Sequence, residues 1–436
     1  MSGITIFEFD ALTADGVNFT EADDVHQIPH SVLAWLEEQC LRAAEARQGP
    51  WLRWCQRGGR RAIQVTSFVG VIRAPDGYQI EVLPKVGKNI GGGVVEVRQL
   101  LIDMLCCLPG FRHIQTDNAK LAAAKMPLLE VFVSEFLRAV ERVVKRGLRS
   151  DYRQRQDNLF ALRGKLMMAP HLRQNLYRAD RFLVEFDEFS TDRPENRLLH
   201  AALRRVLKLT RTQTNQQLAR ELDFVFADVP LPKQIRSDFQ QVRVDRGMGF
   251  YTDALAWARL ILDEESPLTG SGRDTAPSLL FPMEAVFEAY VTKHLSRQLN
   301  ASLTLKTQAR SHHLVEHREQ NWFQLKPDFL VRQSGKDILV LDAKWKLLDR
   351  GKMNGSEKYG LSQSDFYQLQ AYGVSYLDGV GDVVLIYPKT DEFSEPLSVF
   401  DFPKNIGMRL WVLPFCLKQR RLMLPSVSGF GGLFVL

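Results

Sequence analysis

The sequence predicts an α+β protein of several domains: a mixed, β-rich N-terminal domain, a helical middle region and a C-terminal α/β domain. Three observations support this. Short stretches near the start alternate between apolar and polar residues, the middle repeats apolar residues three and four apart, and the last third holds a strand pair followed by a helix and another strand. The 436 residues, 45% of them hydrophobic, suffice for roughly two to four domains. We expect domains at 1–125, 126–265 and 275–436.

The N-terminal domain is expected to contain both strands and helices. Two β-rich stretches flank the turn sequence Pro75-Asp76-Gly77, which predicts a hairpin. The alternation and the apolar spacing along this part predict strands at 4–9, 62–72 and 78–83, and helices at 31–46 and 95–108.

The middle region shows the apolar spacing of amphipathic helices, which we expect at 128–144, 193–210 and 248–262. It also carries a basic stretch, which is either a solvated helical face or a phosphate-binding surface. The stretch consists of Arg138, Arg142, Lys145, Arg146, Arg149, Arg153, Arg155, Arg163, Lys165 and Arg173. A segment rich in Gly, Ser, Thr and Pro follows, and residues 264–278 therefore mark a domain boundary.

Charge and cysteine usage limit the possible classes. The net charge of +6 permits binding to a polyanion without requiring it. The five cysteines form no Cys-x-x-Cys pair, so we expect neither a zinc site nor a disulfide framework, and a reducing cytoplasm fits best. The sequence shows neither a signal-peptide pattern nor about 18 uninterrupted apolar residues, so no membrane association is expected. It also lacks a phosphate-binding Gly-x-x-x-x-Gly-Lys-Ser/Thr loop, so a partner would have to supply any nucleotide hydrolysis.

The segment 325–346 carries the chemistry. Two apolar runs flank a Ser-Gly-Lys-Asp turn and predict a β-hairpin, with Asp342 and Lys344 on the same face of its second strand. An odd-length loop centred on Gly335 would place Asp328 opposite Asp342, and an even loop would make them diagonal neighbours. Asp-x-Lys alone would more simply be a surface ion pair on an edge strand. The Pro327-Asp328 pair on the preceding strand favours a site.

Two aspartates and a lysine at a strand end suit phosphodiester hydrolysis. The carboxylates of Asp328 and Asp342 and the carbonyl of Ala343 are hard oxygen ligands of the kind that Mg²⁺ prefers. The ion would polarise a scissile phosphate and lower the pKa of a bound water. Lys344 would orient or help deprotonate that water and offset charge on the transition state.

Three further residues are candidates on neighbouring helices. Glu288, on a helix expected at 282–299, could hold the metal-bound water or a second ion, or it is an ordinary exposed helix residue. Gln368 and Tyr372 lie four residues apart on a helix expected at 364–376 and share a face. They could hydrogen-bond a catalytic carboxylate or a DNA phosphate. The alternative for this pair is a plain helix with a buried tyrosine.

These motifs resemble a known family. Pro327-Asp328, Asp342-Ala343-Lys344 and Gln368-x-x-x-Tyr372 are similar to the PD-(D/E)XK nuclease core. More of the chain resembles the McrC family, nuclease subunits of modification-dependent restriction systems, on segments that include Phe68–Ile72, Ile80–Lys85, Leu162–Lys165, Pro194–Leu199 and Phe281–Glu288.

The resemblance implies an Mg²⁺-dependent DNA endonuclease, with Asp328, Asp342 and Lys344 as catalytic residues and Glu288, Gln368 and Tyr372 assisting. It implies a McrB-like AAA+ GTPase hexamer as partner, stimulated by the N-terminal part, and double-stranded, methylated DNA as substrate. Two alternatives remain open. One is a stand-alone PD-(D/E)XK nuclease in repair or mobile-element defence, and the other is a non-catalytic adaptor that activates a partner NTPase.

Overall fold

The computed structural model describes residues 3–14, 24–45, 51–57, 59–88, 93–108, 126–178, 180–243, 245–262, 279–403, 407–425, 430 and 432–434. The chain forms two compact units, one from 1–128 with 265–436 and the other from 129–264. The division into domains at 1–125, 126–265 and 275–436 stays a prediction, because 109–125 and 263–278, where its boundaries fall, lie outside the described residues. Within the described ranges, no helix has the length and apolar character needed to cross a membrane.

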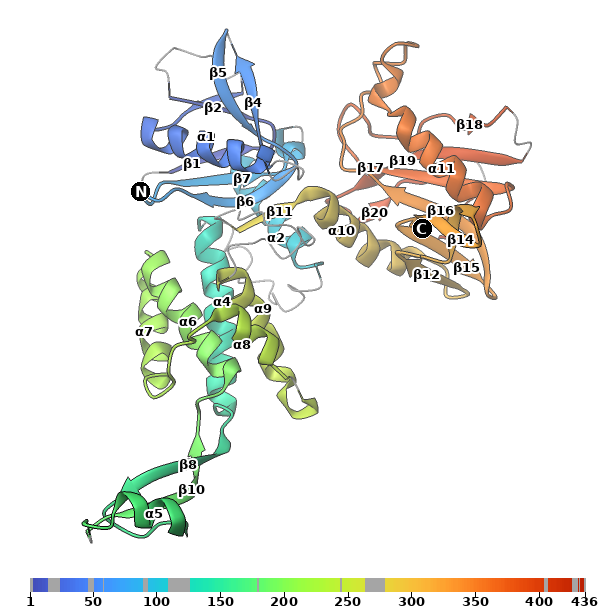
Figure 1. Ribbon diagram of the computed structural model, residues 1–436. Coiled ribbons are helices and arrows are strands. Elements are labelled where there is room, and N and C mark those ends of the chain that lie inside the picture. Colours follow the sequence, from blue (N-terminus) through green and yellow to red (C-terminus); the bar gives the residue numbers. More distant parts are fainter. Residues whose placement is uncertain are drawn as a thin grey trace. The chain divides into compact units, whose positions relative to one another are not determined.

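Two four-stranded sheets build the N-terminal part of the first unit (Figure 1). The first has the order β1-β7-β6-β11, with β1 at Gly3–Phe7, β6 at Phe68–Arg73, β7 at Gln79–Leu83 and β11 at Leu279–Pro282. The second has the order β3-β2-β5-β4, with β2 at Ala11–Thr13, β3 at Val25–Gln27, β4 at Leu52–Arg57 and β5 at Arg60–Val65. The helical elements of this part are α1 at His30–Glu45, η2 at Lys85–Lys88 and α2 at Gly93–Leu105.

The hairpin predicted around residues 75–77 is confirmed, because Arg73 pairs with Gln79 in antiparallel register. The single stretch predicted at 62–72 is wrong in one respect. It breaks at Thr66 and Ser67 into β5 and β6, which belong to different sheets. The apolar residues continue across the break because both strands are buried, so hydropathy alone does not mark it.

Strand β11 returns the chain to the N-terminal sheet after the second unit. It pairs antiparallel with β6, with Leu280 opposite Gly70. Gly70 has φ +130°, and a Cβ there would lie 2.0 Å from the carbonyl oxygen of Leu279. Only glycine allows the two strands to approach this closely.

The second unit combines helices with a three-stranded sheet, which the prediction of a helical middle region did not include. Its helical elements are α4 at Leu128–Arg146, α5 at Met168–Gln174, α6 at Pro194–Leu209, α7 at Gln213–Val225, α8 at Ile235–Gln241, η4 at Arg246–Tyr251 and α9 at Thr252–Leu262. The strands have the order β8-β10-β9, with β8 at Asp151–Leu159, β9 at Lys165–Leu166 and β10 at Phe182–Ser190. Figure 1 shows β8 and β10 extending from the helices, with α5 near their far end.

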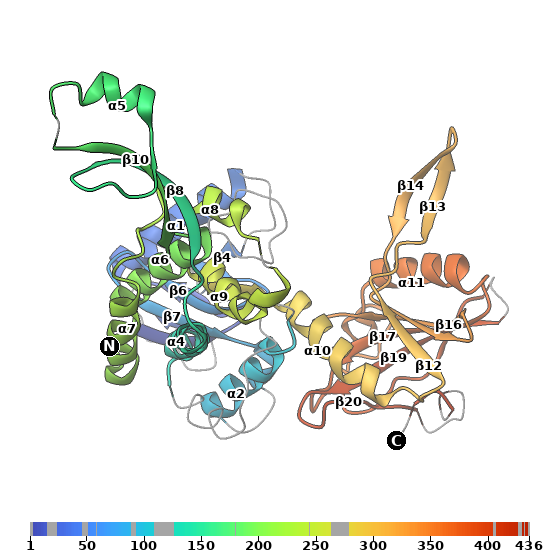
Figure 2. The same cartoon turned by 90° about the horizontal axis from the view of Figure 1, so that it is seen from below.

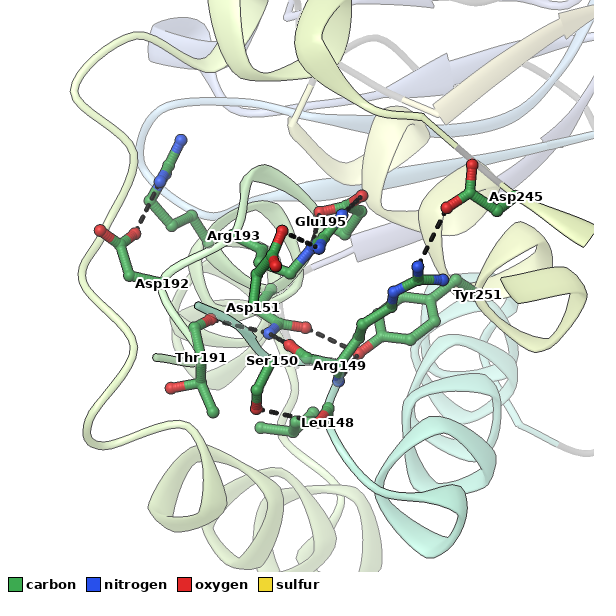
Figure 3. A network of polar contacts seen from close by, with 12 residues as sticks. Leu148, Arg149, Ser150, Asp151, Thr191, Asp192, Arg193, Glu195, Asp245 and Tyr251 are labelled. Atoms are coloured by element: carbon green, nitrogen blue, oxygen red, sulfur yellow. Dashed lines mark hydrogen bonds and ion pairs between the residues drawn. The ribbon is translucent and has the colours of Figure 1, made fainter. Parts of the chain in front are cut away.

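A polar network joins the base of β8 and β10 to the helices of this unit (Figure 3). The hydroxyl of Tyr251 accepts a hydrogen bond from the backbone N–H of Arg149 at 2.9 Å and donates one to the buried Asn196 side chain at 2.7 Å. The Asn196 amide donates in turn to the carbonyls of Arg149 and Thr191. The chain just before β8 and just after β10 is therefore bonded to one buried asparagine.

The C-terminal part of the first unit is built on a seven-stranded sheet of order β12-β15-β16-β17-β19-β18, in which β20 also pairs with β19. The pairs of β16 with β17 and of β17 with β19 are parallel. The strands are β12 at Leu303–Thr307, β15 at Phe329–Gln333, β16 at Lys336–Ala343, β17 at Gly381–Pro388, β18 at Phe400–Asp401, β19 at Met408–Cys416 and β20 at Arg421–Leu422. A separate two-stranded hairpin is formed by β13 at His312–His317 and β14 at Gln320–Leu325.

Helices cover both faces of this sheet (Figure 2). Leu369 and Tyr372 of α11 (Gln363–Tyr376) pack in one core with Val340 of β16 and Val383 of β17. On the opposite face, α10 (Met283–Gln298) places Phe287 against Phe415 of β19, with 6.3 Å between the ring centroids. The helices predicted at 282–299 and 364–376 are thus confirmed within two residues, and the short 3-10 helix η5 (Lys358–Gly360) lies between β16 and α11.

Candidate functional site

The β15–β16 hairpin sets the positions of the two candidate aspartates. Phe329 pairs with Leu341, so the register places Asp328 opposite Asp342, as predicted. The reason differs from the prediction. The turn is an even, two-residue one at Ser334 and Gly335, both with positive φ, and a bulge after Val331 shifts the register by one residue.

Strand β16 carries Asp342 into the interior. It lies between antiparallel β15 and parallel β17, which explains why 338–341 is continuously apolar. Asp342 is only 2% exposed, and the backbone N–H of Lys344 continues the pairing by donating to the carbonyl of Ile386 at 2.8 Å. A carboxylate buried to this extent requires compensating charge or hydrogen bonds. The alternative of a surface ion pair on an edge strand is therefore wrong for Asp342.

Lys344 and helix α11 are linked by a chain of polar contacts. The Lys344 ammonium lies 2.7 Å from Oδ2 of Asp342 and donates a hydrogen bond to Oε1 of Gln368 at 2.9 Å. The Gln368 amide donates to the hydroxyl of Tyr372 at 2.8 Å, and that hydroxyl donates to the carbonyl of Lys326 at 3.0 Å. Gln368 and Tyr372 thus share one face as predicted, but they contact the lysine and the segment before Asp328 instead of a carboxylate.

Burial opposes the negative charge of both aspartates. Oδ2 of Asp328 accepts a hydrogen bond from the backbone N–H of Ala343 at 2.8 Å. Burial, helped by the negative charges of Asp342 and Glu288, nevertheless raises the pKa of Asp328 to about 8. Burial also raises the pKa of Asp342, against the opposing effect of Lys344. Oδ2 of Asp342 is buried, and the ammonium of Lys344 lies 2.7 Å from it.

Glu288 adds a third carboxylate from the other face of the sheet. It lies on α10, is half-buried and accepts a hydrogen bond from the side chain of Gln308. Burial raises its pKa, and the charge of Asp342 raises it further. The pKa of Lys344 is raised as well, since Asp342 stabilises the ammonium more than burial disfavours it. The alternative that Glu288 is an ordinary exposed helix residue is therefore wrong.

The donor set suits a hard divalent cation. The carboxylates of Asp328 and Asp342 repel each other, and the ammonium of Lys344 offsets only part of their combined negative charge. A cation bound by oxygen ligands would relieve this excess of negative charge. Across the described ranges, no three His, Cys, Asp or Glu side chains are grouped closely enough to hold an ion together. The residues that could hold one are thus Asp328 and Asp342, with the carbonyl of Ala343.

One further acidic residue, Asp365, was not singled out from the sequence. It lies in the first turn of α11 and accepts a hydrogen bond from the hydroxyl of Tyr387 at 3.2 Å. Its charge raises the pKa of both Asp342 and Lys344, so it faces the site. Its position three residues before Gln368, on the same helical face, was the available signal.

Comparison with known proteins identifies the family. The family model described as McrBC 5-methylcytosine restriction system component matches residues 63–388, which is most of the chain. The chain belongs to this family. No curated protein matches the chain.

A solved structure of an McrB assembly with bound McrC shares the fold. A chain of the refined half-complex from the tetradecameric assembly of Thermococcus gammatolerans McrB AAA+ hexamers with bound McrC has a TM-score of 0.66 and 18% sequence identity. That match covers 95% of this chain and 94% of the other. A chain of the Thermococcus gammatolerans McrBC complex, solved by cryo-electron microscopy, is 21% identical over 68% of this chain and 87% of that one, with a TM-score of 0.49.

Proposed function

We propose that this McrBC-family chain is the Mg²⁺-dependent DNA endonuclease subunit of a GTP-driven restriction complex, and that it also stimulates the GTPase of an AAA+ partner in the cytoplasm. The seven-stranded sheet with α10 and α11 is then a PD-(D/E)XK core. One observation carries the proposal: Asp328 faces Asp342 across the hairpin, and Lys344 is held between Asp342 and Gln368.

Each residue of the site has a role in hydrolysis. Asp328, Asp342 and the carbonyl of Ala343 would hold the ion, which would polarise the scissile phosphate and lower the pKa of the attacking water. Lys344 orients that water and offsets the negative charge that develops on the phosphate. Because Asp342 and Gln368 fix its ammonium before substrate arrives, little reorganisation is needed during the reaction.

Two residues assist from the helices. Tyr372 ties Gln368 to the carbonyl of Lys326, two residues before Asp328, and so keeps the helix in register with the hairpin. Glu288 lies on α10, on the other side of the sheet, and its carboxylate would hold the attacking water or a second ion.

The partner follows from the family. In the Thermococcus assembly, McrC is bound to McrB AAA+ hexamers. The chain lacks a phosphate-binding loop of its own, so GTP hydrolysis falls to such a partner. Because the family is described by its restriction of 5-methylcytosine, the substrate is double-stranded, methylated DNA.

The test is cleavage of methylated and unmethylated plasmid with Mg²⁺, with and without the cognate AAA+ partner and GTP. Wild type is compared with Asp342→Asn, and Asp337→Asn is the matched control. Asp337 lies on the same strand but forms an ion pair with Arg332, away from the site. We expect cleavage to require partner, GTP and Asp342 and to survive in the control.

The other outcomes identify the alternatives. Cleavage without a partner would make the protein a stand-alone nuclease. No cleavage under any condition, with the partner's GTPase still stimulated, would make it a non-catalytic adaptor. Cleavage retained in Asp342→Asn would refute the site itself.

A further inference from the structure

A buried carboxylate from the N-terminal part reaches the segment directly after Lys344. Glu8 follows β1 and is only 1% exposed. Its carboxylate oxygens lie 3.1 and 3.0 Å from the indole Nε1 of Trp345, which donates to them. The same carboxylate accepts a hydrogen bond from the backbone N–H of Lys85 at 2.9 Å. The Glu8 carboxylate and the Trp345 indole N–H are therefore hydrogen-bonded within the protein.

Lys85 holds the other end of the same tryptophan. Its ammonium donates to the backbone carbonyl of Trp345 at 3.1 Å. It also lies 4.7 Å from the ring centroid of Phe9 and 5.7 Å from that of Trp345, within cation–π range. Trp345 is thus bonded at both its indole and its backbone by residues 337 and 260 positions away in the sequence. We call Glu8, Lys85 and Trp345 the tryptophan clamp.

The clamp adjoins both sides of the proposed active site. Trp345 directly follows Lys344, whose backbone is the last to pair with β17. Its ring packs against Phe287 of α10, with 5.3 Å between the centroids, and Phe287 directly precedes Glu288. A shift of Trp345 would therefore move the catalytic lysine and the assisting carboxylate together.

Attachment of the N-terminal part does not explain these polar groups. The pairing of β6 with β11 already joins the two parts of the first unit through backbone hydrogen bonds. Burying a charged pair costs desolvation that apolar side chains of similar size would avoid. The polar contacts of the clamp fix the orientation of the Trp345 indole and backbone, because hydrogen bonds depend on geometry and apolar packing does so less.

We propose that Glu8 and Lys85 are positioning residues of the nuclease site, acting through Trp345 on Lys344. The inference rests on the proposed nuclease function. It makes the N-terminal part an element of the proposed active site. A shift of Glu8 or Lys85 would then move Lys344 through Trp345, without involving the second unit.

The experiment measures single-turnover cleavage and DNA affinity separately, using the full chain with its AAA+ partner, GTP and Mg²⁺. The variants are Glu8→Gln, Lys85→Met, Trp345→Phe and the double variant Glu8→Gln/Trp345→Phe. Trp411→Phe is the matched control, because the Trp411 indole also donates to a carboxylate, that of Asp382 at 2.8 Å, within the same sheet. Lys85→Met keeps the aliphatic stem and tests the clamp independently of Glu8.

We expect each clamp variant to cleave roughly tenfold more slowly or worse, because small displacements of a catalytic group have effects of this order. DNA affinity, partner binding and the Trp411→Phe rate should stay within about twofold. The double variant should be no slower than the slower single variant, since both changes break one unit.

Three results would overturn the inference: wild-type rates in Glu8→Gln and Lys85→Met, parallel losses of cleavage and DNA or partner binding, or fully additive effects in the double variant. If wild type itself never cleaves, the proposed function fails and the positioning role fails with it. If wild type cleaves and the clamp variants match it, only the positioning role is lost.

Discussion

Replacing Glu8 by glutamine is expected to change how the stability of the first unit depends on pH. Burial raises the pKa of Glu8 from its ordinary value of 4.5 to about 7. Lys85 and the Trp345 indole oppose this rise, and the nearby charge of Glu284 adds to it. In the unfolded chain the same carboxyl group is exposed to water and titrates near its ordinary pKa.

The sign follows from the raised pKa. Below about pH 4.5 the carboxyl group of Glu8 is protonated in both the folded and the unfolded state. Its contribution to the free energy of unfolding is then at its largest. As pH rises towards 7 the unfolded state releases the proton first, so the free energy of unfolding falls. The interval between 4.5 and about 7 corresponds to a loss of about 3 kcal/mol, complete once pH exceeds the folded-state pKa. Glutamine does not titrate, so the variant lacks this dependence.

The assay is denaturant unfolding of wild type and Glu8→Gln at several pH values from 4 to 8, followed through the transition of the first unit. Taking the difference between the two proteins removes the groups that titrate in both. Wild type should lose about 3 kcal/mol relative to the variant across this range. A difference that does not vary with pH, or a wild type that gains stability relative to the variant as pH rises, would refute the reasoning.

Three further changes test other parts of the molecule. Tyr251→Phe removes the hydroxyl that is hydrogen-bonded to Asn196 and to the backbone of Arg149. The unfolding free energy of the second unit should fall by about 1–3 kcal/mol in denaturant titrations. An unchanged midpoint would contradict this. Gly70→Ala would place a Cβ 2.0 Å from a carbonyl oxygen of β11, so the melting temperature should drop clearly, and equal melting would show that β6 and β11 can separate at little cost. Gln368→Ala removes one of the two contacts that hold the Lys344 ammonium and should slow cleavage roughly tenfold with DNA affinity unchanged. A normal rate would mean that the amide does not position the ammonium.

The sequence predicts which side chains of the candidate site lie together because the signals for this are local. Alternation fixes which side chains share a face of a strand, and the spacing of Gln368 and Tyr372 fixes a face of a helix. Asp328 lies opposite Asp342, but an odd-length loop is not the reason. The turn is even, and the bulge after Val331 compensates for it. An extra residue inside an apolar run resembles its neighbours in hydropathy, so sequence alone does not reveal it.

The three-stranded sheet of the second unit could not be predicted in the same way. Strand β8 is exposed along most of its length and has no buried face to produce an alternating pattern. It is held by backbone pairing with β10 and by cross-strand ion pairs such as Arg155 with Glu188. The basic stretch is consequently not one helical face, because it is divided between α4, β8 and the segments after it. Its role as a phosphate-binding surface stays a hypothesis.

The tryptophan clamp shows where local reasoning ends. Glu8 and Trp345 are 337 residues apart, and nothing near either residue indicates the other. Their meeting depends on β11 returning to β6, which places the second unit as an insertion within the first. This topology gives the N-terminal part direct contact with the strand end that carries Lys344. If the partner engages the N-terminal part, as the family resemblance implies, the proposed clamp connects that part to Lys344 through Glu8 and Lys85. Variants of the clamp should therefore slow cleavage while GTP hydrolysis by the partner and binding to it stay unchanged.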